Sequence, residues 1–187
     1  MAPKTPDQGL GLPRQIKACL FDLDGVITQT ALQHAKAWKQ VFEQHDIPFD
    51  EVKDYDTYVD GKPREGGVRS VLKARNIPAT TELVDTIAAE KDRLFVDLIH
   101  KEGVATYPSS ITYIEKAKHE GLKIAVVSSS KHTTDVLKAA KLQNLFDAQV
   151  DGIVAAKEHL KGKPDPDTYL KAAHLLGAVA HDAAVYE

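Results

Sequence analysis

Two short apolar runs, each followed at once by small polar or acidic residues, do most to limit what this chain can fold into. Residues 16–21 and 122–127 are mainly apolar and bounded by polar residues, which is typical of strands buried on both faces of a parallel sheet. Further short strands are expected around 148–154 and 183–186, with helical patterns of ten or more residues between the strands. This alternation predicts an α/β fold with a parallel sheet and right-handed crossovers.

The segment between the first two strands has a different character. Its apolar residues recur with a helical period, and no convincing strand occurs before about residue 103. The predicted helices of this segment are, in chain order, 31–44, 68–76 and 80–100. An irregular segment at 49–67, which contains Gly61 and Pro63, separates the first two. We therefore expect a helical insert over 31–103 within an α/β core made of residues 15–30 and 104–187, preceded by a flexible tail, 1–14.

The core carries its own helix signals. Ser109 or Ser110 is the expected N-cap of a helix through Glu120, and a second helix is expected over 133–142. Asp165 as N-cap and Pro166 at the first helical position predict a third, through Leu176. The carboxyl ends of parallel strands form one edge, where ligands of open α/β sheets bind. We expect a site at that edge, with the inserted helices as its lid.

Composition excludes several kinds of partner. The net charge is −3 without a basic block, which argues against nucleic acid, and no run approaches the ~20 apolar residues that cross a bilayer. Cys19 is the only cysteine, so an intramolecular disulfide is impossible, as is common in a reducing compartment. The apolar fraction of 43% with 27% charged residues is ordinary for a globular protein. We expect a cytoplasmic monomer.

Two carboxylates follow the first strand at a spacing of two. Asp22 and Asp24 leave an extended backbone on the same side, and Gly25 lets the chain turn directly after them. Two acids so close repel each other unless a cation or a shared proton offsets the repulsion. The pair therefore indicates a metal-assisted nucleophile with a proton carrier, although a plain surface turn is also built from Asp and Gly.

Three further features follow strands in the order that phosphoryl transfer requires. Ser128–Ser130 offer hydroxyl and backbone N–H groups to an anion, Lys163 offers a cation, and Glu187 offers a carboxylate for a hard cation such as Mg²⁺. Transfer of a phosphoryl group to a carboxylate needs positioning and charge neutralisation, which these groups supply. Each of these features can also be explained without a catalytic role, since serines are common in turns and a lysine is common in a solvated loop. Lys157 and Lys161 compete with Lys163 for its role.

The four features together resemble the motifs of the haloacid dehalogenase superfamily, over nearly all of residues 16–187. Asp22-Leu23-Asp24-Gly25-Val26-Ile27-Thr28 is similar to its first motif, which is highly specific. Ala125-Val126-Val127-Ser128 resembles the second, Lys163-Pro164 the third, and Val185-Tyr186-Glu187 the opening of the fourth. The resemblance implies a Rossmann-like parallel core with an inserted α-helical cap of the C1 type.

Within the superfamily, the chain most resembles the β-phosphoglucomutase group. This likeness implies an aspartyl-phosphate on Asp22, with Asp24 as general acid and base. Ser128 and Lys163 would hold the transferring phosphoryl group. Mg²⁺ would lie between Asp22, the Asp24 backbone carbonyl and the fourth-motif acids, of which Glu187 is present.

The same likeness implies substrate contacts in the cap and in the serine loop. The residues concerned are His34, Trp38, Arg64 and Lys91 in the insert, and Ser129, Ser130 and Lys131 after the second strand. Arg64 would clamp the second phosphate of a small phosphorylated sugar. Trp38 and His34 also suit simple helix packing, and Lys91 lies on an apolar stripe where a lysine often extends its head group to water.

The sequence departs from the mutase pattern in three places. Gln29 stands where an acidic residue is expected, Gly67 where a small hydroxyl side chain is expected, and no second acid follows Glu187. The resemblance thus implies a chain truncated at the fourth motif. The leading function is conversion of β-glucose 1-phosphate to glucose 6-phosphate through a bisphosphate. The alternatives are a sugar-phosphate phosphatase and an inactive domain of a larger fusion protein.

Overall fold

The computed structural model describes residues 9–60 and 62–187, so Gly61 and the predicted tail residues 1–8 lie outside the described residues. The chain divides into two compact units. The core unit consists of the described residues up to Thr30 together with 104–187, and the helical unit consists of Ala31–Gly103.

The core unit is built on a four-stranded parallel sheet, as the alternating pattern predicts. Its strands are β1 (Ala18–Asp22), β2 (Lys123–Val127), β3 (Ala148–Val150) and β4 (Ala183–Tyr186), in the order β3-β2-β1-β4. Asp22 pairs with Val127 and Phe21 with Tyr186. The central strand β1 therefore ends level with both of its neighbours, which brings their carboxyl ends together.

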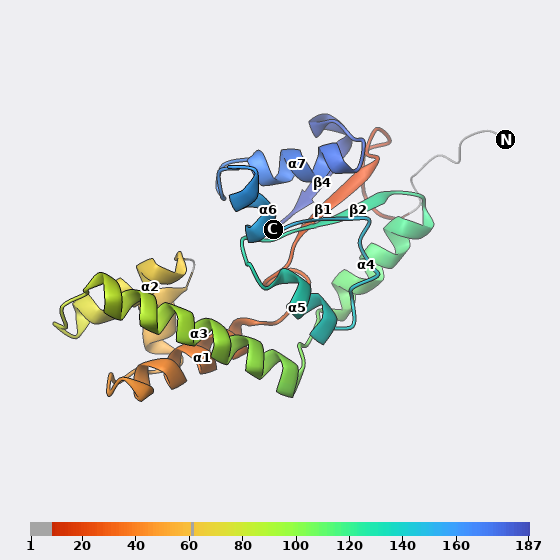
Figure 1. The fold of residues 1–187 in the computed structure, drawn as a ribbon. Helices are drawn as coiled ribbons and strands as arrows, with labels where there is room; N and C mark the ends of the chain where they lie inside the picture. The colour runs from red at the N-terminus through yellow and green to blue at the C-terminus, as the bar shows by residue number, and fades with distance from the viewer. Residues whose placement is uncertain (1–8, 61) are drawn as a thin grey trace. The chain divides into compact units, whose positions relative to one another are not determined.

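Helices cover both faces of this sheet, because the side chains of a strand alternate between its faces. The helices of the core unit are α4 (Pro108–His119), α5 (Thr133–Ala139), α6 (Gly152–Lys157) and α7 (Asp167–Leu175), and a short 3₁₀ turn (Ala180–Asp182) leads into β4. Leu20 packs in a buried cluster with Ala172 and Ala173 of α7. Phe21 points to the other face and makes an edge-on contact with Tyr113 of α4. Figure 1 shows α4 and α7 on opposite sides of the sheet.

Several predicted boundaries in the core unit are wrong. The first of these helices begins at Pro108 after Tyr107, not at a serine cap, and Ser110 instead donates a hydrogen bond to the Val26 carbonyl (2.7 Å). Helix α5 ends at Ala139 rather than at 142, and α7 begins at Asp167 with Pro166 as its N-cap. The third strand stops at Val150, because the Asp151 carboxylate accepts hydrogen bonds from two backbone N–H groups and starts α6.

The helical unit contains α1 (Ala31–Gln44), α2 (Arg64–Ala74), α3 (Thr81–Glu102) and a π-helical turn (Tyr55–Val59). Phe42 lies at the centre of its apolar core, stacked between Trp38 and Phe49. The Thr80 side chain caps α3, accepting a hydrogen bond from the Leu83 N–H. The segment 49–67, expected to be a loop or short turns, contains the short π-helical turn, but α2 already begins at Arg64, before its predicted start at residue 68. Among the described residues, no helix is long and apolar enough to cross a membrane.

The start of the described chain is tied to the core unit through Leu10. Leu10 is buried, and its carbonyl accepts a hydrogen bond from the Tyr113 hydroxyl (3.0 Å). That hydroxyl lies 2.6 Å from the hydroxyl of Tyr186 on β4. Leu10 therefore packs beside α4, while several of the residues between it and β1 are exposed.

An ion pair at the base of β1 predicts a pH dependence of stability. Lys17 Nζ donates to Asp182 Oδ2 (2.5 Å), and this bond lowers the pKa of Asp182 below its usual value. A lowered carboxyl pKa stabilises the fold above the unfolded-state pKa of about 4, and this stabilisation is lost as the pH falls through the folded value. We expect Asp182→Asn to lower the melting temperature at pH 7, with a difference from wild type that shrinks below pH 4. A difference that stays constant from pH 7 to pH 3, measured by circular dichroism, would contradict this.

Candidate active site

The strand register gathers acidic and hydroxyl side chains at the carboxyl edge of the sheet. Asp22 ends β1, Ser128 follows its partner Val127 on β2, and Glu187 follows β4. Ser128 is buried, and its N–H donates to the Val150 carbonyl (3.0 Å), which continues the pairing with β3 past the strand end. Three of the residues predicted for the site therefore lie at one edge.

Lys163 supplies the positive charge at this edge. Its Nζ lies 2.7 Å from Asp22 Oδ1 and 2.7 Å from Glu187 Oε1, so one ammonium group bridges two carboxylates. The side chains of Lys163 and Asp22 are about one-fifth exposed (21% and 19%), whereas that of Glu187 is 54% exposed. The competing lysines do not share this position: Lys157 is exposed, and Lys161 pairs with Asp165 at 3.8 Å in solvent.

The electrostatics of this cluster keep its charges in place at neutral pH. Burial disfavours the charged form of Lys163, but its hydrogen bonds to Asp22 and Glu187 outweigh burial and raise the pKa of Lys163. The hydrogen bond from Lys163 lowers the pKa of Glu187. The site therefore presents a fixed cation beside the Asp22 carboxylate.

Asp24 is held by the turn that follows β1. Gly25 has a φ of 82°, a conformation that favours glycine, and its N–H donates to the Thr28 carbonyl (2.8 Å). The tight turn brings Thr30 back to Asp24, and the buried Thr30 hydroxyl donates a hydrogen bond to Asp24 Oδ1. Sequence reasoning missed this role of Thr30, for which a hydroxyl six residues after the acid is the only signal.

The serine loop after β2 is a compact turn. The Ser128 hydroxyl accepts a hydrogen bond from the Ser130 N–H (3.1 Å), and the Ser130 hydroxyl accepts one from the His132 N–H (3.0 Å). The Ser130 carbonyl accepts from the Gly152 N–H (3.0 Å), which ties the loop to the start of α6. Ser129 and Lys131 lie in the same loop, and Lys131 is exposed.

Gly152 provides a test of this packing. A Cβ at Gly152 would lie 2.6 Å from the Ser129 carbonyl oxygen, a backbone atom that cannot move without shifting the loop. We expect Gly152→Ala to lower the free energy of unfolding by about 1–3 kcal/mol, the usual cost of overpacking. Urea unfolding measures this change. Gly162→Ala is the control, because a Cβ there meets nothing within 4 Å, and equal losses in the two variants would refute the explanation.

The helical unit holds Arg64, the residue predicted to clamp a second phosphate. Arg64 is the first residue of α2 rather than part of an irregular loop. Its guanidinium donates to the Asp92 carboxylate of α3 and to Glu65 Oε1 (2.8 Å). Arg64 is therefore already paired within its own unit, so an anionic ligand would have to share it with these carboxylates.

Lys91, His34 and Trp38 form a second cluster in the helical unit. Lys91 is 5% exposed, and its Nζ lies 2.8 Å from His34 Nδ1 and 5.2 Å from the Trp38 ring centroid. His34 stacks on Phe95 with ring centroids 4.0 Å apart. Trp38 is buried among the apolar residues of the unit, as the packing alternative expects. Lys91 does not extend its head group to water, which was the alternative for a lysine on an apolar stripe.

The side chains at this edge can be compared with the ligands that a divalent cation needs. No group of three His, Cys, Asp or Glu side chains within residues 9–60 and 62–187 lies close enough to hold a metal. Asp22 and Glu187 do converge on a single cation, the Lys163 ammonium. Mg²⁺ is often held by only one or two carboxylates and keeps several waters, so these two side chains fit it.

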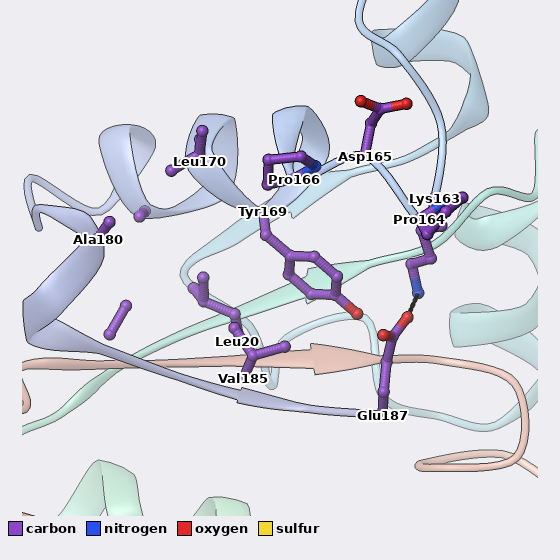
Figure 2. A pocket seen from close by; sticks show the side chains of 12 residues that line it. Leu20, Lys163, Pro164, Asp165, Pro166, Tyr169, Leu170, Ala180, Val185 and Glu187 are labelled. Carbon is purple, nitrogen blue, oxygen red and sulfur yellow. Dashed lines mark ion pairs between the residues drawn. The ribbon is translucent and has the colours of Figure 1, made fainter.

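A cavity of about 300 Å³ lies between α7 and the sheet, beside this cluster (Figure 2). Leu20, Leu170 and Val185 form its apolar part, and Lys163 and Glu187 lie at its polar end. Tyr169 of α7 lies between the apolar part and the polar end of the cavity, with its ring centroid 5.0 Å from Lys163 Nζ. Sequence reasoning missed Tyr169, although its place on the helix that follows Lys163-Pro164 could have indicated it.

Comparisons with known proteins identify the family of the chain. A family model described as haloacid dehalogenase-like hydrolase matches residues 16–187. A β-phosphoglucomutase of Mycobacterium tuberculosis is 42% identical, covering 99% of this chain and 78% of that protein. Hexitol phosphatase A of Escherichia coli is 30% identical over 91% of this chain and 74% of its own. The crystal structure of β-phosphoglucomutase from Clostridium difficile superposes with a TM-score of 0.75 at 28% identity, over 92% of this chain and 76% of that one.

A parallel sheet whose carboxyl edge carries paired acids, a serine and a lysine defines a class of phosphoryl-transfer proteins. The chain belongs to the haloacid dehalogenase-like hydrolase family, and its β-phosphoglucomutase relatives make it an enzyme of the phosphomutase or phosphatase kind.

Proposed function

We propose that the chain carries the catalytic apparatus of a sugar-phosphate mutase that converts β-glucose 1-phosphate to glucose 6-phosphate. The observation that carries the proposal is the Lys163 ammonium, held 2.7 Å from Asp22 at the carboxyl edge of the sheet. A carboxylate can approach an anionic phosphoryl group only if nearby cations offset the repulsion between them. The 42% identity to a mycobacterial β-phosphoglucomutase supports the choice of substrate.

In this proposal Asp22 is the nucleophile. A carboxylate oxygen of Asp22 forms a bond to phosphorus, the bond from phosphorus to the sugar oxygen breaks, and Asp24 gives a proton to that oxygen. In the reverse transfer, Asp24 takes the proton of a sugar hydroxyl as this hydroxyl attacks the phosphoryl group on Asp22. The bond from the Asp22 oxygen to phosphorus then breaks and the Asp22 carboxylate leaves. The hydrogen bond from Thr30 to Asp24 orients the proton carrier.

The remaining core residues bind the phosphoryl group. Lys163 neutralises its oxygens, and Ser128 offers a buried hydroxyl, with Ser129, Ser130 and Lys131 extending the loop on that side. Asp22, the Asp24 backbone carbonyl and Glu187 would hold Mg²⁺. The ion, when bound, would neutralise charge on the transferring group.

Residues of the helical unit are proposed to bind the rest of the substrate, so that this unit acts as a cap. Arg64 and Lys91 are cations suited to a second phosphate, and His34 and Trp38 lie beside Lys91. A mutase needs anchors for the phosphate that is not reacting as well as for the one that is. The clusters around Arg64 and Lys91 offer cations for this second anchor.

The test uses the product to distinguish mutase from phosphatase. The 187-residue chain and a version extended to the full length of its relatives are incubated with β-glucose 1-phosphate, Mg²⁺ and a trace of the bisphosphate, and ³¹P NMR follows the products. We expect glucose 6-phosphate. Inorganic phosphate with free glucose would identify a phosphatase, and no reaction by either chain would favour an inactive domain.

A phosphatase is the second candidate, favoured by two observations. Hexitol phosphatase A is similar over 91% of the chain. Gln29, which replaces an acidic residue of the mutase pattern, donates its side-chain amide to the Thr106 carbonyl (2.9 Å). An amide held in this way cannot act as the acid would.

A further inference from the structure

Tyr169 lies against the catalytic lysine without belonging to any of the four motifs. It is on the first turn of α7, and its ring centroid is 5.0 Å from Lys163 Nζ, within the range of a cation–π interaction. Figure 2 shows the hydroxyl pointing toward the ends of the Lys163 and Glu187 side chains. The ring therefore covers one side of the ammonium, while the carboxylates approach from others.

The hydroxyl of Tyr169 is in an unusual state. Its oxygen is buried and has no hydrogen-bond partner of ordinary geometry among the described residues. A buried hydroxyl without a partner is unfavourable, which makes a functional reason for it worth testing.

The Lys163 ammonium needs a hydrogen-bond acceptor that stays in place when a ligand binds. An ammonium has three donors, and the bonds to Asp22 and Glu187 account for two of them. The Glu187 side chain is 54% exposed and would be drawn away by a cation, whereas Tyr169 is fixed on a helix. When a ligand takes Glu187, the Tyr169 oxygen remains beside the ammonium.

We propose that Tyr169 is a positioning residue, whose ring and hydroxyl keep the Lys163 ammonium directed at Asp22 and at the incoming phosphoryl oxygens. This inference rests on the proposed function of Asp22 and Lys163. It adds a fixed aromatic partner to the lysine, which none of the motifs implies.

The experiment is a double-mutant cycle between Tyr169→Phe and Lys163→Met. Tyr169→Phe keeps the ring and removes only the hydroxyl, which in this proposal accepts a hydrogen bond from the Lys163 ammonium once a ligand has taken Glu187. We therefore expect kcat to fall about tenfold, the effect of one hydrogen bond to a charged group, and KM to rise no more than several-fold. In the Lys163→Met background the same substitution should change kcat little, because its partner is gone. The melting temperature should stay the same or rise, because an unpaired buried hydroxyl is removed.

Tyr107→Phe, which removes a hydroxyl at the start of α4, is the control and should keep wild-type kinetics. A wild-type kcat for Tyr169→Phe, or equal losses in both lysine backgrounds, would overturn the inference.

Inorganic phosphate keeps the test independent of turnover. Its affinity for the extended chain with Mg²⁺, measured by calorimetry, should fall several-fold in Tyr169→Phe, but not in the Lys163→Met background. If phosphate binds in this way while no sugar phosphate reacts, the proposed function fails and the positioning role stands. Unchanged phosphate affinity in Tyr169→Phe would overturn the positioning role even if the mutase activity is present.

Discussion

Replacing Asp22 with asparagine is expected to abolish covalent labelling of the protein by a phosphoryl donor and to lower turnover by a thousandfold or more. The amide keeps the shape of the side chain but is a poor nucleophile, so the bond to phosphorus cannot form. The Lys163 ammonium loses the negative charge of its partner at position 22, although the amide oxygen can still accept its hydrogen bond, and it keeps the ion pair with Glu187. Acid-quenched labelling with a ³²P-labelled sugar phosphate, followed by peptide mapping, measures the effect.

The control for this experiment is Asp135→Asn, an aspartate on α5 whose weak pair with His132 spans 3.8 Å. It removes one carboxylate from the core unit without touching the site, and it should label like wild type. Label that persists in Asp22→Asn at the wild-type level would end the assignment of Asp22 as nucleophile. Equal loss in both variants would mean that labelling depends on net charge instead.

Lys163→Met is expected to lower the rate of phosphoryl transfer by about 10²–10³-fold. Methionine occupies a similar volume but carries no charge, so the ammonium no longer offsets the repulsion between the Asp22 carboxylate and the phosphoryl oxygens. The loss should appear mainly in kcat, because the interaction strengthens as charge develops in the transition state. Steady-state kinetics with β-glucose 1-phosphate measures it.

Lys161→Met is a closely matched control, two residues earlier in the same turn. Its side chain is 72% exposed and pairs only loosely with Asp165. We expect wild-type kinetics for Lys161→Met. A comparable loss in both lysine variants would show that the turn contributes general positive potential and not a placed ammonium.

Elements defined by local patterns were predicted well. Helix α1 occupies the predicted range of Ala31–Gln44, and β4 occupies Ala183–Tyr186, because a helical stripe and a short apolar run are signals contained within the element itself. The order of the strands along the chain also predicted that Asp24, Ser128 and Glu187 would share one edge, and in the structure Asp22, Ser128 and Glu187 follow or end neighbouring strands there. Parallel strands impose this result whatever the loops between them do.

Boundaries were predicted less well where two local signals compete. The apolar run at 148–154 reads as one strand, but the Asp151 side chain accepts from the Ile153 and Val154 N–H groups and turns the second half into α6. A helix cap and a strand end use the same residue types, and tertiary packing decides between them. The same holds for Ser109 and Ser110, which lie inside α4 because Pro108 takes the first helical position.

The sequence by itself determined the parallel sheet, the order of the polar residues along its edge, and the family to which the chain belongs. Only the tertiary structure decided which lysine meets Asp22, how Asp92 holds Arg64, and that the Tyr169 hydroxyl faces the ammonium without a hydrogen bond of its own. The physical reason is distance along the chain. Periodicity and caps act within a few residues, whereas Asp22 and Lys163 are 141 residues apart and meet only because β1 and the turn before α7 end on the same side of one sheet.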